Sequence, residues 1–137
     1  MELLKNNRPK IIRTKLLRLI GKKMITLPWG VYAAPSADIR EIDVTHEFIH
    51  VVQYRELMVA SLVLTIPMAF VSAWWTLLIP FVAYYLWYGI EWLVHFIRLK
   101  DPHLAYRRIC FEREAYENQN DLNYLESRSW FKFIQFL

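Results

Sequence analysis

The residues best suited to chemistry lie together in one short stretch, Thr45-His46-Glu47-Phe48-Ile49-His50. On an α-helix, His46 and His50 are four residues apart and would face the same way, so both imidazoles can point at one ion. Zinc binds such nitrogens at about 2.0–2.1 Å and keeps one position for water in catalytic sites. Glu47 would lie beside that position, where its carboxylate can accept a proton from the water. This His-Glu-x-x-His pattern is typical of zinc metalloproteases, and the alternative is a surface helix that carries the same letters by chance.

A metal site of this kind needs a third ligand, and the stretch 102–118 offers one. Asp101 precedes Pro102 as an N-cap precedes the first helical residue, which predicts that a helix follows. On it Glu112, Ala115 and Tyr116 would share one face. We expect Glu112 to be the third zinc ligand, with Ala115 small enough for this helix to approach the first.

Two charged residues near Glu112 bear on its assignment as the third ligand. Arg108, one turn before Glu112, is expected to orient its carboxylate. Glu114 faces elsewhere and is the second choice as ligand. The alternative is that Glu112 and Glu114 are both solvated helix charges.

Between the two candidate ligand helices lies a long uncharged segment. No Asp, Glu, Lys or Arg occurs from Leu57 to Ile90, which is typical of a membrane-embedded chain. One straight helix of that length would measure about 51 Å, too long for a hydrocarbon core of about 30 Å. Pro67 and Pro80 are expected to interrupt it, so a helical hairpin over 57–99 with a turn at 72–76 fits better. The paired Trp74 and Trp75 then suit a membrane–water interface at the hairpin tip.

Charge and ligand geometry both favour two crossings. Ten Lys or Arg residues precede Leu57 and seven follow Ile90, so both basic flanks belong on the cytoplasmic side. A single crossing would separate His50 from Glu112 by about 30 Å, whereas a hairpin returns them to the same side. We therefore expect a multi-pass protein of the cell (inner) membrane with its active site facing the cytoplasm.

The remaining segments complete a single domain of 137 residues with a net charge of +4. In residues 1–24, basic residues are interspersed with apolar residues at helical spacing. This indicates an amphipathic helix that lies on an anionic membrane surface or packs on the domain. The apolar run downstream argues against a nucleic-acid partner for this basic segment. Residues 25–43 should hold one or two short extended segments and a loop, and 44–56 the His-Glu-x-x-His helix, capped by Asp43 or Thr45. Residues 119–137 should form an interfacial tail or cover the core.

Three further ionisable residues have simpler interpretations. Cys110 is the only cysteine, so an internal disulfide is excluded, and a small buried residue is expected. Glu91 and His95 are four apart near the inner end of the second membrane helix. Ionisable groups at membrane depth are candidates for function, but a mutually paired couple near the headgroups is the preferred interpretation.

The order His46-Glu47-x-x-His50, membrane hairpin, Glu112-x-x-Ala115 resembles the glutamate-zincin metallopeptidases over roughly residues 45–118. In layout it is most similar to the membrane-integrated HtpX-like and CAAX-prenyl-protease group, and the segment around Glu112 also resembles small bacterial proteins with a His-Glu-x-x-His motif. The resemblance implies that His46, His50 and Glu112 bind zinc and that Glu47 is the general base. The larger membrane proteases have an Asp that supports a zinc histidine where this chain has Tyr116. Either the Tyr116 hydroxyl does that work or the site is weaker than theirs.

Peptide hydrolysis also needs a donor for the developing oxyanion, and Tyr116, Tyr106, His103 and Arg107 are candidates that the sequence does not separate. By analogy with zincins, the extended segment near 31–34 is expected to be a sheet edge that pairs with substrate.

The sequence therefore predicts a mainly α-helical integral membrane protein, with a helical hairpin between two active-site helices and a minimal zincin-like core. Its predicted function is zinc metalloendopeptidase, acting on a peptide or membrane-protein substrate through a zinc-activated water, with Glu47 and Tyr116 as catalytic residues. The alternatives are a non-catalytic membrane protein with a structural zinc site, a membrane-protein interaction module, and a chain that binds no metal.

Overall fold

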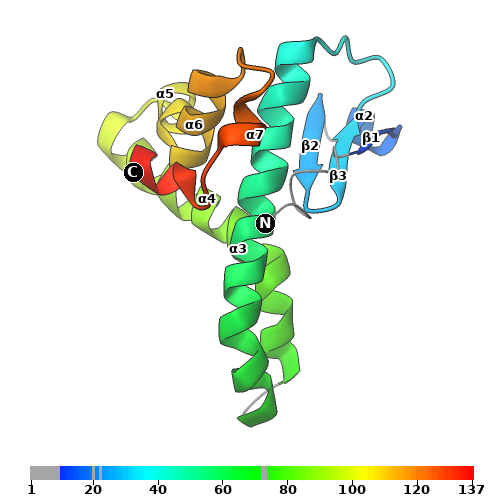
Figure 1. The fold of residues 1–137 in the computed structure, drawn as a ribbon. Coiled ribbons are helices and arrows are strands. Elements are labelled where there is room, and N and C mark those ends of the chain that lie inside the picture. Colours follow the sequence, from blue (N-terminus) through cyan, green and yellow to red (C-terminus); the bar gives the residue numbers. More distant parts are fainter. Residues whose placement is uncertain (1–9, 20, 22, 72–73) are drawn as a thin grey trace. The chain divides into compact units, whose positions relative to one another are not determined.

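The computed structural model describes residues 10–19, 21, 23–71 and 74–137, and these are mainly helical with one small sheet (Figure 1). By their contacts they group into two compact units. One contains Met1–Val52 and Glu114–Ser129, and the other contains Gln53–Arg113 and Trp130–Leu137. The two helices that carry the candidate ligands each contribute residues to both units.

The first unit contains a three-stranded sheet in the order β1-β3-β2, built from β1 (Lys10–Arg13), β2 (Met24–Leu27) and β3 (Gly30–Ala33). β2 and β3 form an antiparallel hairpin, and β1 runs parallel to β3. Gly30 is required where β1 meets β3, because a Cβ at this position would lie 2.6 Å from the backbone oxygen of Lys10. The extended segments expected within 25–43 are confirmed.

Two expectations for this region are wrong. Lys10–Arg13 is a strand and not part of an amphipathic helix; the β-branched pair Ile11 and Ile12 suits a strand, and the bare backbone of Gly30 admits it beside β3. Among the described residues of this stretch, helical structure is limited to the single turn α2 (Leu16–Leu19). Most of the rest of the expected helix, residues 1–9, lies outside the described residues. β3 is paired on both sides, so 31–34 is the centre of the sheet and cannot be an edge that pairs with substrate.

The organising helix is α3 (Glu41–Val71), which carries the His-Glu-x-x-His stretch. It starts three residues before the expected 44–56 helix, and Asp43 is inside its first turn. There the Asp43 carboxylate accepts from the backbone N–H of Arg40 at 3.1 Å, which is the reach-back half of a capping box. The helical context that the zinc motif requires is therefore confirmed.

α3 runs through Pro67 without a break, which corrects the expectation that this proline interrupts the segment. Pro67 cannot donate a backbone hydrogen bond. In the turns before it, Ser61 Oγ donates to the Leu57 carbonyl at 2.5 Å and Thr65 Oγ1 donates to the Ser61 carbonyl at 2.9 Å. These hydroxyls stay satisfied without water, as they must in an apolar stretch.

The second unit holds the later part of α3 beside the return segment, which consists of the 3-10 turn η1 (Trp74–Leu78) and α4 (Ile79–Leu99) (Figure 1). Tyr54 ties the two together, because its hydroxyl donates to the Phe81 carbonyl and its ring lies 4.9 Å from that of Tyr84. Pro80 stands in the first turn of α4, where a missing N–H costs little. The expected turn at 72–76 falls partly outside the described residues, since 72 and 73 are not described.

Within the described residues, two helices are long and apolar enough to cross a membrane, Glu41–Val71 and Trp74–Leu99. Their most apolar stretches are only 17% and 11% buried, whereas the core helix of a soluble protein would be mostly buried. Large apolar side chains such as Phe70, Val71 and Leu86 are well exposed.

The segment expected as one helix over 102–118 is two helices, α5 (Pro102–Arg108) and α6 (Cys110–Asn118), separated by the extended backbone of Ile109. The Asp101 cap is confirmed, since its carboxylate accepts from the N–H groups of His103 and Leu104. The chain ends with α7 (Tyr124–Ser127) and the 3-10 turn η2 (Lys132–Phe136). Phe133 is fully buried, with its ring 4.8 Å from that of Phe111, so the tail covers core as well as exposing Ile134 and Leu137.

Candidate metal centre

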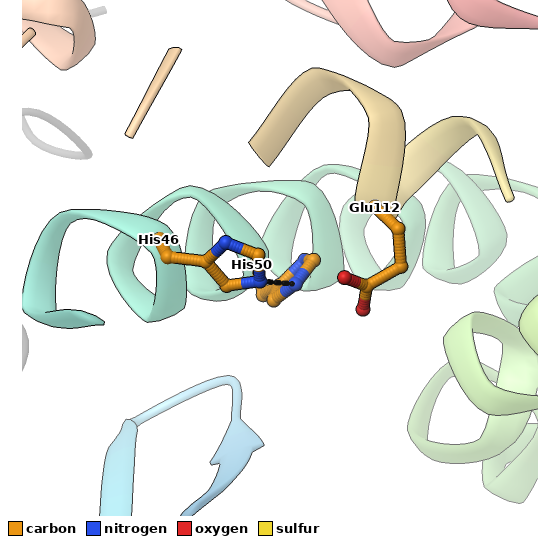
Figure 2. A group of neighbouring side chains, drawn as sticks. All are labelled: His46, His50 and Glu112. Atoms are coloured by element: carbon orange, nitrogen blue, oxygen red, sulfur yellow. Dashed lines mark hydrogen bonds between the residues drawn. The ribbon is translucent and has the colours of Figure 1, made fainter. Parts of the chain in front are cut away.

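The two histidines of the motif meet as the helical spacing predicts. His46 and His50 are both buried on α3, and their Nε2 atoms lie 3.1 Å apart (Figure 2). Two nitrogens bound tetrahedrally to zinc at about 2.05 Å would lie about 3.3 Å apart. The pair is therefore already spaced almost as two ligands of one zinc ion would be.

The ring of His46 is held from its other side by residues at the end of α6. Nδ1 of His46 lies 3.0 Å from Oε1 of Gln119, and the Tyr116 ring packs edge-on against the His46 ring at 4.7 Å. An amide oxygen accepts, so this contact assigns the proton to Nδ1 and leaves Nε2 of His46 free of a proton, as a metal ligand requires.

Gln119 is a residue that the sequence argument missed. The sequence spacing could have identified it, because Gln119 is seven residues after Glu112. Seven residues are about two helical turns, so Gln119 would lie on the same helix face as Glu112. Tyr116 lies beside His46, at the position where the resemblance implies support for a zinc histidine.

Glu47 points toward the sheet. Its Oε2 accepts from the hydroxyl of Thr26, a buried residue of β2, at 2.5 Å. The Thr26 contact fixes one carboxylate oxygen by a charge-assisted hydrogen bond and leaves the other for a different proton. Thr26 was also missed, since no local spacing links it to a residue 21 positions away.

Glu112 stands in the first turn of α6 and is 2% exposed. Its Oε1 accepts from the hydroxyl of Tyr88 on α4 at 2.7 Å. Arg108, which was expected to orient this carboxylate, has an exposed side chain, and the observed donor is Tyr88. A buried carboxylate is costly unless it is hydrogen-bonded or paired with a cation, and the Tyr88 hydroxyl supplies one such hydrogen bond.

α3 and α6 lie against each other within each unit. In the first, Ile49 and Ala115 belong to one buried cluster with Tyr124, and in the second the Gln53 amide donates to the Phe111 carbonyl at 3.1 Å. The small side chain of Ala115 is fully buried, as expected for a close helix contact. One ligand atom each from His46, His50 and Glu112 all lie within 4.8 Å of one another (Figure 2).

The second-choice ligand, Glu114, has a different partner. Both of its carboxylate oxygens accept from the Arg128 guanidinium, at 2.5 and 3.2 Å, and Tyr124 OH donates to it at 2.9 Å. Glu114 and Arg128 are both buried. Glu114 therefore anchors the segment after α6. The alternative that Glu112 and Glu114 are solvated charges is wrong for both, because both are buried.

The candidate oxyanion donors differ in their surroundings. Tyr116 is the one that lies against a candidate ligand ring, while His103, Tyr106 and Arg107 have exposed side chains on α5. Of these four candidates, Tyr116 is therefore best placed beside the candidate ligands.

Glu91 and His95 form a pair at 3.7 Å, as expected, but Glu91 does more than pair. Its carboxylate accepts from the backbone N–H of Cys110 at 2.8 Å, from the Cys110 thiol at 3.0 Å and from the Trp87 indole at 3.1 Å. Burial, with the nearby Glu91 carboxylate, raises the pKa of the Cys110 thiol well above its usual range. Cys110 is buried, as expected.

No protein-family model matches the chain, and no curated protein or solved structure shows a significant similarity to it.

Proposed function

We propose that this protein is a membrane-embedded zinc metallopeptidase. The observation that carries the proposal is the buried His46, His50 and Glu112 group, which brings two imidazoles and one carboxylate together. Two His and one Glu are a common ligand set of catalytic zinc, which keeps a fourth position for water or substrate. The same donor set also suits iron(II), and the His-Glu-x-x-His spacing of His46 and His50 is what favours zinc.

Zinc bound by these residues would polarise a peptide carbonyl and lower the pKa of a bound water. The residues of this chain then have separate tasks. Gln119 fixes the tautomer of His46, and Tyr88 holds one oxygen of Glu112. Glu47 would be the base that accepts a proton from such a water and delivers it to the leaving amine, while Thr26 restrains its other oxygen. Tyr116, beside His46, is our choice for the donor to the oxyanion.

We place the protein in the cell membrane, with α3 and α4 forming a two-crossing hairpin. The support is the exposure of their apolar stretches, which would be costly in water and favourable in lipid. The basic residues on both flanks support a cytoplasmic position for the metal group. Along α3, His50 is seven residues from Leu57, so it lies about 10 Å before the uncharged stretch begins. A peptide segment close to the bilayer, including one from another membrane protein, is therefore the substrate class we propose.

The test compares the wild-type protein with Glu47→Gln, both purified in detergent and loaded with zinc. We expect one zinc per chain in both and cleavage of a membrane-anchored peptide by the wild type alone. Glu41→Gln is the matched control, because Glu41 is exposed on the same helix and should not affect cleavage. Equal cleavage by wild type and Glu47→Gln would exclude this mechanism. Bound zinc without cleavage by either would instead support the alternative of a structural zinc site.

A further inference from the structure

The third ligand is held from the apolar hairpin rather than from its own helix. Glu112 is in the first turn of α6, and the groups that contact this turn include two residues of α4, Tyr88 and Glu91. These two are three residues apart, so they lie one turn apart on the same side of α4.

The first contact is the hydrogen bond from Tyr88 OH to Glu112 Oε1, at 2.7 Å. A carboxylate can only accept, so the phenol is the donor. The Tyr88 ring is itself packed in an aromatic group, stacked on Phe111 at 6.3 Å and close to Tyr84 and Tyr106 at 6.1 and 6.2 Å. A ring fixed in this way has little freedom to move, so the hydroxyl constrains the direction of the carboxylate.

The second contact fixes the backbone that carries Glu112. Glu91 accepts from the N–H of Cys110, the first residue of α6, at 2.8 Å. The N–H groups at a helix start have no partner within the helix, and a carboxylate placed there also interacts favourably with the helix dipole. The Trp87 indole donates to the same carboxylate at 3.1 Å and fixes it. α4 therefore holds both the start of α6 and the side chain two residues further on.

We propose that Tyr88 is a positioning residue for the third metal ligand, with Glu91 as its backbone counterpart. Both act from a helix that we place in the bilayer, so the inference extends the proposed metal centre and depends on it. Metal affinity should therefore depend on these two contacts from α4.

The experiment measures zinc affinity by competition with a chromophoric chelator, and the absorption spectrum of the Co²⁺-loaded protein. Tyr88→Phe removes one hydroxyl and keeps the ring. Residues that support a metal ligand typically change affinity by about 10–100-fold, which is the loss we expect, together with a changed Co²⁺ spectrum. Tyr85→Phe is the matched control, because Tyr85 lies one turn earlier on α4 and its ring packs on Tyr84 and Tyr54. It should leave affinity and spectrum unchanged.

A second variant, Glu91→Gln, keeps an acceptor for the Cys110 N–H but removes the charge, so we expect a smaller loss of affinity in the same direction. Wild-type affinity and Co²⁺ spectrum in Tyr88→Phe would overturn the inference while leaving the metal centre intact. An equal loss in Tyr85→Phe would also overturn it, since the effect would then be general to α4. A wild-type chain that binds neither Zn²⁺ nor Co²⁺ would overturn the metal centre and this inference together.

Discussion

Removing the acceptor beside His46 should weaken metal binding without removing a ligand. In Gln119→Leu the side chain keeps a similar size but loses Oε1, which lies 3.0 Å from Nδ1 of His46. The His46 ring would then lose both the contact that orients it and the preference for a proton on Nδ1. Loss of such a partner costs about 10–100-fold in metal affinity, or about 1.4–2.7 kcal/mol.

The assay is a zinc competition titration of wild type and variants at one pH, with the fold monitored by circular dichroism. Gln119→Glu keeps an acceptor and adds charge, so its affinity should equal or exceed that of the wild type. Gln135→Leu is the control, because Gln135 is exposed on η2 and accepts from Lys132. Loss of a group that supports a metal ligand usually lowers metal affinity by about 10-fold or more. If the zinc affinity of Gln119→Leu stays within about twofold of wild type, the role assigned to Gln119 is refuted.

Three further predictions concern neighbouring groups. Thr26→Val should lower the rate of peptide cleavage by about 100-fold at unchanged zinc content, because Glu47 loses the bond that positions it, and steady-state kinetics with zinc analysis measures both. Glu114→Gln should lower the free energy of unfolding by about 3–5 kcal/mol, measured by denaturant titration, because it removes the carboxylate charge that the buried Arg128 guanidinium contacts. Cys110 should resist thiol reagents in the folded protein at neutral pH. Burial raises the pKa of this thiol, which therefore stays protonated at neutral pH. The protonated thiol contributes its full stabilisation below the unfolded-state pKa of about 8.5. This contribution is lost as the pH rises from there through the higher pKa of the folded protein.

Matched variants separate these effects from general damage. Thr26→Ser keeps the hydroxyl and should recover most of the cleavage lost in Thr26→Val. Glu117→Gln removes an exposed charge from the same helix as Glu114 and should change stability little. Cys110 should react with thiol reagents in denaturant. Rapid labelling of Cys110 in the folded protein at pH 7 would show that the thiol is not buried.

Local patterns were enough to predict that His46, His50 and Glu112 come together. The i, i+4 spacing fixes His46 and His50 on one face, and the run of uncharged residues predicts two apolar helices that return the chain. Glu112 followed from its place on a helix that follows the hairpin, with Ala115 as the small residue on the same face. Each of these inferences uses one helical segment at a time.

The contacts that depend on tertiary structure were not predictable in the same way. Thr26, Tyr88 and Gln119 reach the group from a strand, the hairpin and the end of α6, at sequence distances of 21, 24 and 73 residues from their partners. The strand at Lys10–Arg13 was misassigned because alternating basic and apolar residues fit a helix as well, and only pairing with Gly30–Ala33 decides. The same pairing makes β3 central, which excludes it as a substrate edge.

X-ray absorption spectroscopy of the zinc-loaded protein tests the proposed centre most directly. We predict one zinc per chain with nitrogen and oxygen ligands at about 2.0–2.1 Å, including the outer-shell scattering of two imidazoles. His50→Ala and Glu112→Gln should each remove a ligand from this shell, while Glu114→Gln should not. A sulfur shell near 2.3 Å, or a spectrum unchanged by Glu112→Gln, would contradict a metal held by His46, His50 and Glu112.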